Sequence, residues 1–333
     1  MKNYKVLLCD EEEGFVMALM NYINRNSNIP ILAMAFTEEK SLAMYLEQHK
    51  ADLLVINATW KKMETMSEFD GSVLWMLDES EQKSSVEPEG NCISKYTLAS
   101  DFVRNMLQIL SEKKPFISTG ADSSCMAVYS PLGRCGKTRF AHALCENQVM
   151  NPGITAGRSI YLGMEEYGEN GTENHGMDAL LYFVKQQAAN LSLKMKSLAI
   201  EQKGYDVIFS ALSYRELREL RKEDIGWLLN CVRTEGYYDL LLADIGSGSL
   251  SDIEILAEFD VIYFPYLQDN ISGEKVQAFC RSLKNQGLWE RIYTKCYPVL
   301  LQDRKIEAKE AGQLEEQRRK GVLRTLDCLC SHS

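Results

Sequence analysis

Apolar residues in the first third of the chain fall into short runs separated by amphipathic stretches. The runs cover residues 5–9, 31–36, 52–57, 73–77 and 92–95. Between them, apolar residues recur at helical spacing, first at Phe15, Leu19, Tyr22 and Ile23, then at Leu42 and Leu46, and last from Phe102 to Leu110. Strands that alternate with helices predict a parallel sheet covered on both faces.

The same alternation resumes after a polar stretch. Strands are predicted at 125–129, 159–163, 206–209, 237–246, 261–266 and 291–296, and helices at 139–145, 177–195, around 225–232 and at 273–286. The stretch itself contains Lys113-Lys114-Pro115 and Gly120-Ala121-Asp122 and lacks apolar periodicity. The pattern therefore predicts an α/β protein with a first domain at 1–112, a linker at 113–124 and a second domain at 125–333.

The chain has 333 residues, of which 45% are hydrophobic. This composition is sufficient for two domains, each with its own hydrophobic core. No apolar run approaches the ~18 residues of a spanning helix. Residues 1–5 lead directly into the first strand rather than into a signal peptide. The ten cysteines lack framework spacing, which predicts free thiols and a cytoplasmic location.

Charge is unevenly distributed along the chain. Residues 1–110 hold 10 basic and 17 acidic residues, a net charge of −7, and the remainder holds 27 and 30, a net charge of −3. Because nucleic-acid binding relies on excess positive charge, we expect no specific nucleic-acid partner.

Residues 129–138, with the sequence YSPLGRCGKT, have the order strand, turn and helix start. Such a turn directs backbone N–H groups and the positive end of a helix dipole at an anion. Gly136 would let the backbone approach phosphates, Lys137 would reach the β- and γ-phosphates, and Thr138 would bind Mg²⁺. The formal motif begins with Gly where this chain has Pro131, and an ordinary helix start is the alternative.

A second strand end supports the phosphate-binding interpretation. The apolar run at 237–246 ends in Asp244, which would hold Mg²⁺ through a water, and Gly246, whose turn could move with the γ-phosphate. The alternative for Asp244 is a helix N-cap. Pro131, Glu165, Asp244 and Pro265 all follow strands, where ligands bind in parallel sheets.

The first domain resembles a degenerate receiver domain of response regulators. Asp10 and Glu11 match the acidic pair of that family and Lys95 matches its lysine, but the phosphoacceptor position is Asn57 and the strand-four hydroxyl position is Asp78. An amide is a poor phosphoryl acceptor, so we expect no phosphorylation at Asn57. We also expect the acidic residues 10–13 to complement a helix dipole rather than bind metal.

The second domain resembles the MinD/ParA branch of P-loop ATPases, and the whole chain resembles the TadZ/CpaE proteins of Tad (Flp) pilus assembly. The signature lysine that reaches across the dimer in MinD/ParA proteins is replaced by Leu132. The family's Asp-x-Asp strand end appears as Gly163-Met164-Glu165, which leaves Glu165 as the candidate for positioning water.

The resemblance implies three catalytic residues, Lys137, Glu165 and Asp244, and Thr138 and Asp244 as Mg²⁺ ligands. The implied nucleotide contacts are Leu132, Gly133, Arg134, Cys135, Gly136, Lys137, Thr138, Arg139 and Gly246. Loss of the cross-dimer lysine and of a carboxylate removes terms of about 2–4 kcal/mol each from transition-state stabilisation. We therefore expect ATP to bind and to turn over slowly or not at all. Arg134 is either a substitute for the lysine or a solvated side chain.

The function that follows is an ATP-binding homodimer that recruits pilus-assembly proteins in the cytoplasm, at a cell pole or at the inner face of the membrane. The main alternative is an active positioning ATPase that acts on DNA, membrane or another cargo. A phosphorylation-controlled response regulator and a small-molecule enzyme are further alternatives. The sequence identifies neither the partner nor the adenine contacts, although Lys295 lies where the family has an adenine-side residue.

The C-terminal residues carry two further signals. Cys328, Cys330 and His332 are spaced too tightly for a usual zinc site, so we expect a frayed terminus. A helix is predicted at 306–329, with an apolar face that includes Val322 and Leu326 beside basic residues at 318–320. Such a helix fits a membrane surface, but packing on its own domain is the favoured interpretation.

Overall fold

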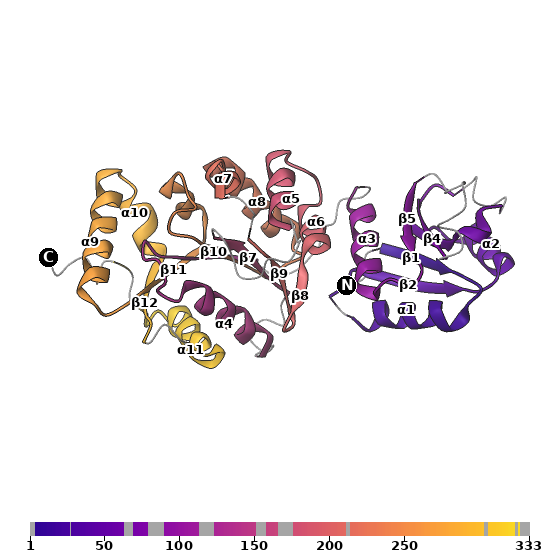
Figure 1. The fold of residues 1–333 in the computed structure, drawn as a ribbon, viewed down its shortest axis with the longest axis horizontal. Helices are drawn as coiled ribbons and strands as arrows, with labels where there is room; N and C mark the ends of the chain where they lie inside the picture. The colour runs from indigo at the N-terminus through magenta and orange to yellow at the C-terminus, as the bar shows by residue number, and fades with distance from the viewer. Residues whose placement is uncertain are drawn as a thin grey trace. The chain divides into compact units, whose positions relative to one another are not determined.

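The structure, a computed structural model, describes residues 4–26, 28–62, 69–78, 90–112, 123–150, 158–165, 176–210, 214–302, 306–323 and 326. The chain divides into two compact units, Met1–Phe116 and Ile117–Ser333 (Figure 1). Residues 113–122, most of the predicted linker, lie outside the described residues, and so does the tail with Cys328, Cys330 and His332.

The first unit contains a parallel sheet of five strands in the order β2-β1-β3-β4-β5. The strands are β1 (Tyr4–Cys9), β2 (Ile31–Phe36), β3 (Leu53–Asn57), β4 (Ser72–Leu77) and β5 (Asn91–Ser94). The helices are α1 (Glu13–Arg25), α2 (Glu39–Gln48), the 3₁₀ turn η1 (Ala58–Lys62) and α3 (Ala99–Ser111). The predicted parallel α/β architecture is confirmed for this unit.

The second unit contains a seven-stranded sheet in the order β12-β11-β6-β10-β7-β9-β8, in which only β8 is antiparallel to its neighbour. The strands are β6 (Ser124–Tyr129), β7 (Ser159–Met164), β8 (Ile200–Gln202), β9 (Tyr205–Ile208), β10 (Leu240–Ile245), β11 (Val261–Tyr266) and β12 (Cys296–Leu300). The mostly parallel sheet predicted for this part of the chain is confirmed.

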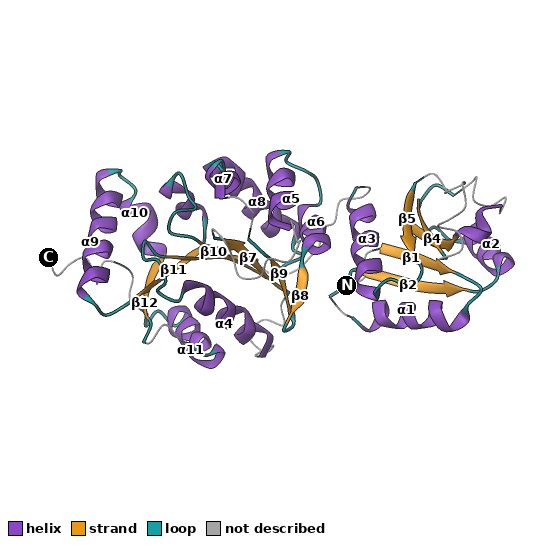
Figure 2. Ribbon diagram, viewed as in Figure 1, coloured by secondary structure: helices purple, strands orange, loops and turns teal. Residues whose placement is uncertain are grey.

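Helices cover both faces of the second sheet (Figure 2). Helices α4 (Lys137–Met150) and α11 (Ala308–Arg319) lie together on one face. The other helices are α5 (Gly176–Lys185), α6 (Leu191–Leu198), α7 (Tyr214–Arg218), α8 (Lys222–Glu235), η3 (Ile253–Glu258), α9 (Asn270–Asn285), α10 (Trp289–Ile292) and η4 (Tyr293–Lys295). Of these, α5, α7 and α8 lie on the face opposite α4.

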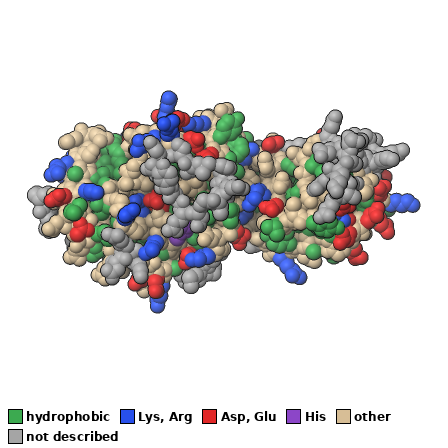
Figure 3. All heavy atoms as spheres, viewed as in Figure 1, with side chains coloured by type: hydrophobic (Ala, Val, Ile, Leu, Met, Phe, Trp, Pro, Cys, Tyr) green, Lys and Arg blue, Asp and Glu red, His purple; other side chains and the backbone are tan. Residues whose placement is uncertain are grey.

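Charged side chains of both signs lie on the surface. On the face shown in Figure 3, basic and acidic side chains are interspersed over both units. Among the helices of the described residues, none combines the length and the apolar composition needed to cross a bilayer.

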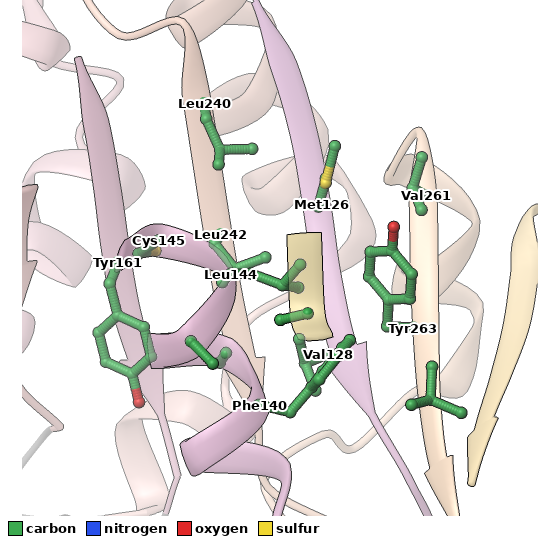
Figure 4. Close-up of a cluster of buried hydrophobic side chains, with 14 of the residues drawn as sticks. Met126, Val128, Phe140, Leu144, Cys145, Tyr161, Leu240, Leu242, Val261 and Tyr263 are labelled. Atoms are coloured by element: carbon green, nitrogen blue, oxygen red, sulfur yellow. The ribbon is translucent and has the colours of Figure 1, made fainter. Parts of the chain in front are cut away.

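Helix α4 is held on the second sheet by a buried apolar cluster (Figure 4). Phe140, Leu144 and Cys145 on one face of α4 pack with side chains of four neighbouring strands: Val128, Tyr161, Leu242 and Tyr263. The Phe140 and Tyr263 rings meet edge to face, with centroids 5.2 Å apart, which adds a directional contact to the burial of apolar area. This packing fixes the start of α4 at the carboxyl end of β6.

Two predicted elements of the second domain are wrong. The stretch 291–296 forms α10 and η4, and the edge strand β12 begins only at Cys296. Pro298 lies within β12, and proline is tolerated on an edge strand because one side of the backbone has no ladder to join. The predicted helix 177–195 is broken between α5 and α6, where Gln187 and Asn190 have left-handed φ values of 48° and 55°.

The last described helix is shorter than predicted. The expected helix 306–329 corresponds to α11, which ends at Arg319. It packs against α4, as the interpretation of a helix on its own domain requires.

Seven cysteines in the described part of the chain are free thiols: Cys9, Cys92, Cys125, Cys135, Cys145, Cys231 and Cys296. Cys280 is disulfide-bonded instead. The expectation of free thiols is therefore wrong for Cys280, because scattered sequence spacing does not reveal which cysteines meet in space.

Candidate functional site

Three strand ends bring the candidate residues of the second unit together. In the register of the sheet, Ile245 of β10 lies opposite Tyr129 of β6 on one side and Met164 of β7 on the other. The residues that follow these three are Gly246, Ser130 and Glu165. The turn that the sequence predicts to bind phosphate, Glu165 and the Asp244–Gly246 segment thus meet at one edge of the sheet.

The turn between β6 and α4 has the backbone of an anion-binding loop. Arg134 and Gly136 both have left-handed φ values, of 58° and 94°. The Ser130 hydroxyl accepts a hydrogen bond from the Leu132 N–H at 3.2 Å. Helix α4 begins at Lys137 directly after the turn, so its first N–H groups face the loop.

The residues of this turn divide into a buried and an exposed set. Leu132, Cys135 and Lys137 are buried, Gly136 and Thr138 are partly buried, and Gly133, Arg134 and Arg139 are exposed. Exposure of Arg134 is compatible with both interpretations of its side chain, the solvated one and the substitute for the cross-dimer lysine.

Glu165 contacts both polar side chains at the start of α4. One carboxylate oxygen lies 3.5 Å from the Lys137 ammonium, and the other accepts a hydrogen bond from the Thr138 hydroxyl at 3.0 Å. Lys137 also donates to the Leu132 carbonyl at 3.2 Å. The two side chains that would contact phosphate and metal are therefore paired with a carboxylate, an anion of this chain.

Asp244 is fully buried and only partly satisfied. Its Oδ2 accepts a hydrogen bond from the Tyr161 hydroxyl at 2.9 Å, while its Oδ1 has no hydrogen-bonding partner among the described residues. Burial, and next the negative charge of Glu165, raise the pKa of Asp244 to about 7, against the opposing effects of Thr138, Lys137 and Tyr161. A buried carboxylate oxygen without a partner is a group that a cation would stabilise.

These residues fit a nucleoside triphosphate with Mg²⁺. Lys137 and the loop amides match phosphate oxygens, and the Thr138 hydroxyl and Asp244 match a hard cation. Among the described residues, no group of three or more His, Cys, Asp or Glu side chains is arranged to hold a metal. A Mg²⁺ ion here would thus take its other ligands from phosphate and water, as Mg²⁺ usually does.

Gly246 occupies a crowded position, where an added side chain would require Ser249 to move. A Cβ atom built there would lie 2.3 Å from the Ser249 hydroxyl oxygen and 3.3 Å from the Glu165 Cα. The Gly246 N–H donates to the Met164 carbonyl at 2.9 Å. The segment after Asp244 is therefore packed directly against the strand end that carries Glu165.

A cavity of about 1300 Å³ adjoins this cluster. Thr138, His142 and Glu146 line it from α4, Tyr161 from β7, Glu165 from the residue after β7, and Gln313 from α11. The Thr138–Glu165 pair is thus accessible from this cavity.

The receiver-like residues of the first unit form a closed polar cluster. Buried Asp10 accepts hydrogen bonds from the Asn57 amide at 2.7 Å and from the Lys95 ammonium at 2.9 Å. Lys95 also pairs with Glu12 at 3.0 Å. Although burial acts to lower it, hydrogen bonds to Asp10 and Glu12 raise the pKa of Lys95.

Asp10 therefore does more than complement a helix dipole. Its Oδ1 accepts from the Glu12 N–H at 2.8 Å, before α1 begins, and both carboxylate oxygens are engaged by side chains. The Asn57 side chain is an amide and offers no carboxylate to which a phosphoryl group could be attached. The neighbouring Asp10 and Lys95 form an ion pair with each other.

Sequence reasoning missed the aromatic side chains around Asp244. Tyr161 lies within an apolar strand and His142 within an apolar helix face, so both look like core residues in the sequence. The structure places Lys295 away from the cluster: its ammonium donates to the Ala257 and Phe259 carbonyls at 2.8 and 3.0 Å.

The sequence matches no protein-family model, and a search of curated proteins finds no match either. Solved structures with a similar course of the chain include a ParA family ATPase from Chlorobium tepidum, which is 12% identical, with 61% of this chain and 81% of that chain covered and a TM-score of 0.44. The cell division ATPase MinD from Pyrococcus furiosus is 16% identical, with 58% and 80% covered and a TM-score of 0.37.

A third similar structure is cobyrinic acid a,c-diamide synthase from Mycobacterium smegmatis, solved with a bound ATP analogue and magnesium. It is 13% identical, with 59% of this chain and 80% of that chain covered and a TM-score of 0.41. Similarity of this size decides neither ligand nor activity, so both are argued from the residues of the site.

Proposed function

We propose that the second unit binds ATP with Mg²⁺ at the turn between β6 and α4. The observation that carries this proposal is the meeting of Lys137, Thr138 and buried Asp244 at one edge of a parallel sheet, directly beside a helix N-terminus. Lys137 would bind the β- and γ-phosphates. Thr138 and Asp244 would hold the metal, which supplies charge neutralisation at the phosphates.

Turnover of ATP would be slow or absent. Leu132, which is buried, offers no charge at the position where MinD/ParA proteins carry their signature lysine. Glu165 is the carboxylate placed to position water, but here it is bound to Lys137 and Thr138. Each missing electrostatic contact of this type costs about 2–4 kcal/mol of transition-state stabilisation.

We further propose that the protein acts as a homodimeric localisation factor that recruits pilus-assembly proteins on the cytoplasmic side of a membrane, in the manner of TadZ/CpaE. The support is the combination, in one chain, of a P-loop unit and a receiver-like unit whose phosphoacceptor position is an amide. The first unit would then dock partners and receive no phosphoryl signal.

An active positioning ATPase is the second candidate. The observation in its favour is that Glu165 retains a carboxylate within hydrogen-bonding reach of Thr138, at the edge where γ-phosphate would lie. Phosphate release that accelerates at least tenfold on addition of DNA or of anionic vesicles would favour this candidate over the localisation factor.

The decisive experiment is a titration of a fluorescent ATP analogue with and without Lys137→Ala. Removal of the ammonium should weaken binding at least 30-fold, because a charge-assisted contact to phosphate is lost. Lys185→Ala is the matched control, since Lys185 forms a surface ion pair with Glu219 and should leave affinity unchanged. Equal affinity of Lys137→Ala and the unaltered chain would refute the proposed site.

The proposed dimer is tested by molecular mass in solution. Light scattering should give twice the mass of the 37.9 kDa chain when ATP and Mg²⁺ are present at saturating concentration. A monomer under those conditions, at micromolar protein, would contradict the dimeric localisation factor while leaving ATP binding intact.

A further inference from the structure

A line of aromatic side chains leads from Asp244 to the cavity beside α4. The Tyr161 hydroxyl donates to the Asp244 Oδ2 at 2.9 Å. The Tyr161 ring stacks on the His142 imidazole, with centroids 4.2 Å apart and planes inclined by 21°. His142 Nδ1 shares a hydrogen bond with the Tyr205 hydroxyl at 2.8 Å. These four side chains come from β10, β7, α4 and β9.

Tyr161 is placed to hold Asp244 in a single orientation. Its ring extends from β7 toward α4 (Figure 4), and the stack on His142 limits its rotation. One carboxylate oxygen of Asp244 is thereby occupied, and only Oδ1 is left for another ligand.

His142 links this contact to the phosphate-binding turn. It lies one helical turn after Thr138 on α4, so both side chains are on the same side of the helix and both line the cavity. The Tyr161–His142 stack and Thr138 therefore border the same cavity, on the side of α4 that faces it.

We propose that Tyr161, supported by the stacked ring of His142, is a positioning residue that orients Asp244 for Mg²⁺. This inference rests on the proposed function, because it concerns the metal that accompanies the nucleotide. The Tyr161 hydroxyl fixes Oδ2 of Asp244, so the carboxylate is held in one rotamer with Oδ1 directed at the metal.

The test measures nucleotide affinity twice, with Mg²⁺ and with EDTA, in the full chain. Tyr161→Phe should weaken Mg²⁺-dependent binding of the fluorescent ATP analogue about tenfold and change binding in EDTA less than twofold, because only the metal ligand loses its orientation. His142→Ala should give a similar but smaller effect. His142→Phe, which keeps an aromatic ring for the stack, should restore binding toward that of the unaltered chain.

Tyr238→Phe is the matched control. The Tyr238 hydroxyl donates to Asp206 Oδ2 at 3.0 Å, a buried tyrosine–aspartate contact of the same kind elsewhere in the same unit. The Tyr238→Phe variant measures how the loss of such a hydrogen bond affects stability alone. It should leave unchanged the ratio of the nucleotide affinity with Mg²⁺ to that in EDTA.

Two results would overturn the inference. One is a Tyr161→Phe variant whose affinity ratio equals that of the unaltered chain. The other is a Tyr161→Phe variant that loses affinity equally with Mg²⁺ and EDTA, which would make Tyr161 purely structural. If the unaltered chain binds no nucleotide under either condition, the proposed function itself fails instead.

Discussion

Glu165 competes with nucleotide for two side chains of the candidate site. Its carboxylate contacts Lys137 and Thr138, the two side chains that would bind phosphate and metal. A triphosphate would have to displace these contacts, because the same donors cannot serve both anions at full strength. Glu165 is thus a candidate for positioning water, and its contacts with Lys137 and Thr138 should also weaken ATP binding.

Glu165→Gln should therefore tighten ATP binding and slow any residual turnover. The amide keeps the shape of the side chain but removes the charge that holds Lys137, and we expect about a tenfold gain in affinity, equal to about 1.4 kcal/mol. Titration with the fluorescent ATP analogue measures the first effect, and phosphate release measures the second.

Glu146→Gln serves as the control for that prediction. Glu146 lines the same cavity but pairs with Lys203 rather than with the phosphate-binding turn. If both glutamine variants gained affinity equally, the general negative charge of the cavity, and not the Lys137 contact, would be responsible.

Residue spacing predicted part of this site. Lys137 and Thr138 follow from the turn sequence, and Asp244 follows from a carboxylate at the end of an apolar strand. Tyr161 could not be found in this way, since a tyrosine in an apolar strand is most often a core residue. Its contact with Asp244 depends on sheet register across 83 positions, which spacing alone does not contain.

Helix α11 is anchored by one buried carboxylate. Glu315 accepts hydrogen bonds from Arg318 and Arg319 at 2.7 Å and also contacts the Tyr263 hydroxyl on β11. Although burial opposes it, the hydrogen bonds from Arg318, Tyr263 and Arg319 hold the pKa of Glu315 below its usual value. The helix that borders the cavity is thereby tied to the sheet.

Glu315→Gln should destabilise the second unit by about 2–3 kcal/mol at pH 7, since hydrogen bonds to a buried charged group are lost. A lowered folded-state pKa means that this stabilisation is present above the unfolded value of about 4.3 and is lost as pH falls through the folded value. The difference from the unaltered chain should thus shrink below about pH 4. Urea unfolding across pH measures it.

The neighbouring Glu316→Gln is the control for α11. Glu316 is exposed and its side chain pairs only with Lys320 among the contacts of the described residues, so its loss should leave the free energy of unfolding nearly unchanged. Equal destabilisation by the two variants would assign the effect to helix charge rather than to the buried anchor.

The order of helices and strands could be predicted wherever the spacing of apolar residues distinguishes a strand from a helix. The apolar runs at 125–129 and 237–246 became β6 and β10 because a buried parallel strand is apolar on both faces. The break between α5 and α6 was missed because its left-handed residues, Gln187 and Asn190, are neither glycine nor proline. Strand β8 was missed because three residues carry too little pattern.

At the level of the whole molecule, each unit carries its own cluster of charged residues at the carboxyl edge of its own parallel sheet. In the first, Lys95 is paired with Asp10 and Glu12. In the second, buried Asp244 retains an oxygen without a hydrogen-bonding partner among the described residues. In the first cluster Asp78 Oδ1 also lacks a hydrogen bond, but it lies 3.9 Å from the Lys95 ammonium, whose charge opposes a further cation. We therefore expect a bound cation at the second cluster.

Calorimetry of the full chain should therefore show ATP and Mg²⁺ raising the unfolding temperature of one transition and leaving the other in place. At 100 times the dissociation constant the ligand adds about 2.7 kcal/mol, or roughly 5–10 °C for a unit of this size. In Lys137→Ala, with affinity at least 30-fold weaker, the same ATP concentration adds at most about 0.9 kcal/mol, so the shift should fall to about a third or less. Transitions that shift together would show instead that the units unfold as one.

Strand β8 closes one border of the second sheet. It turns back on β9 through Lys203 and Gly204, and its residues Glu201 and Gln202 are exposed. Without it, the backbone donors and acceptors on the outer side of β9 would be open to a strand from another molecule. A three-residue strand with exposed polar residues is a poor template for such pairing, so the short hairpin protects this border of the sheet from joining a strand of another molecule.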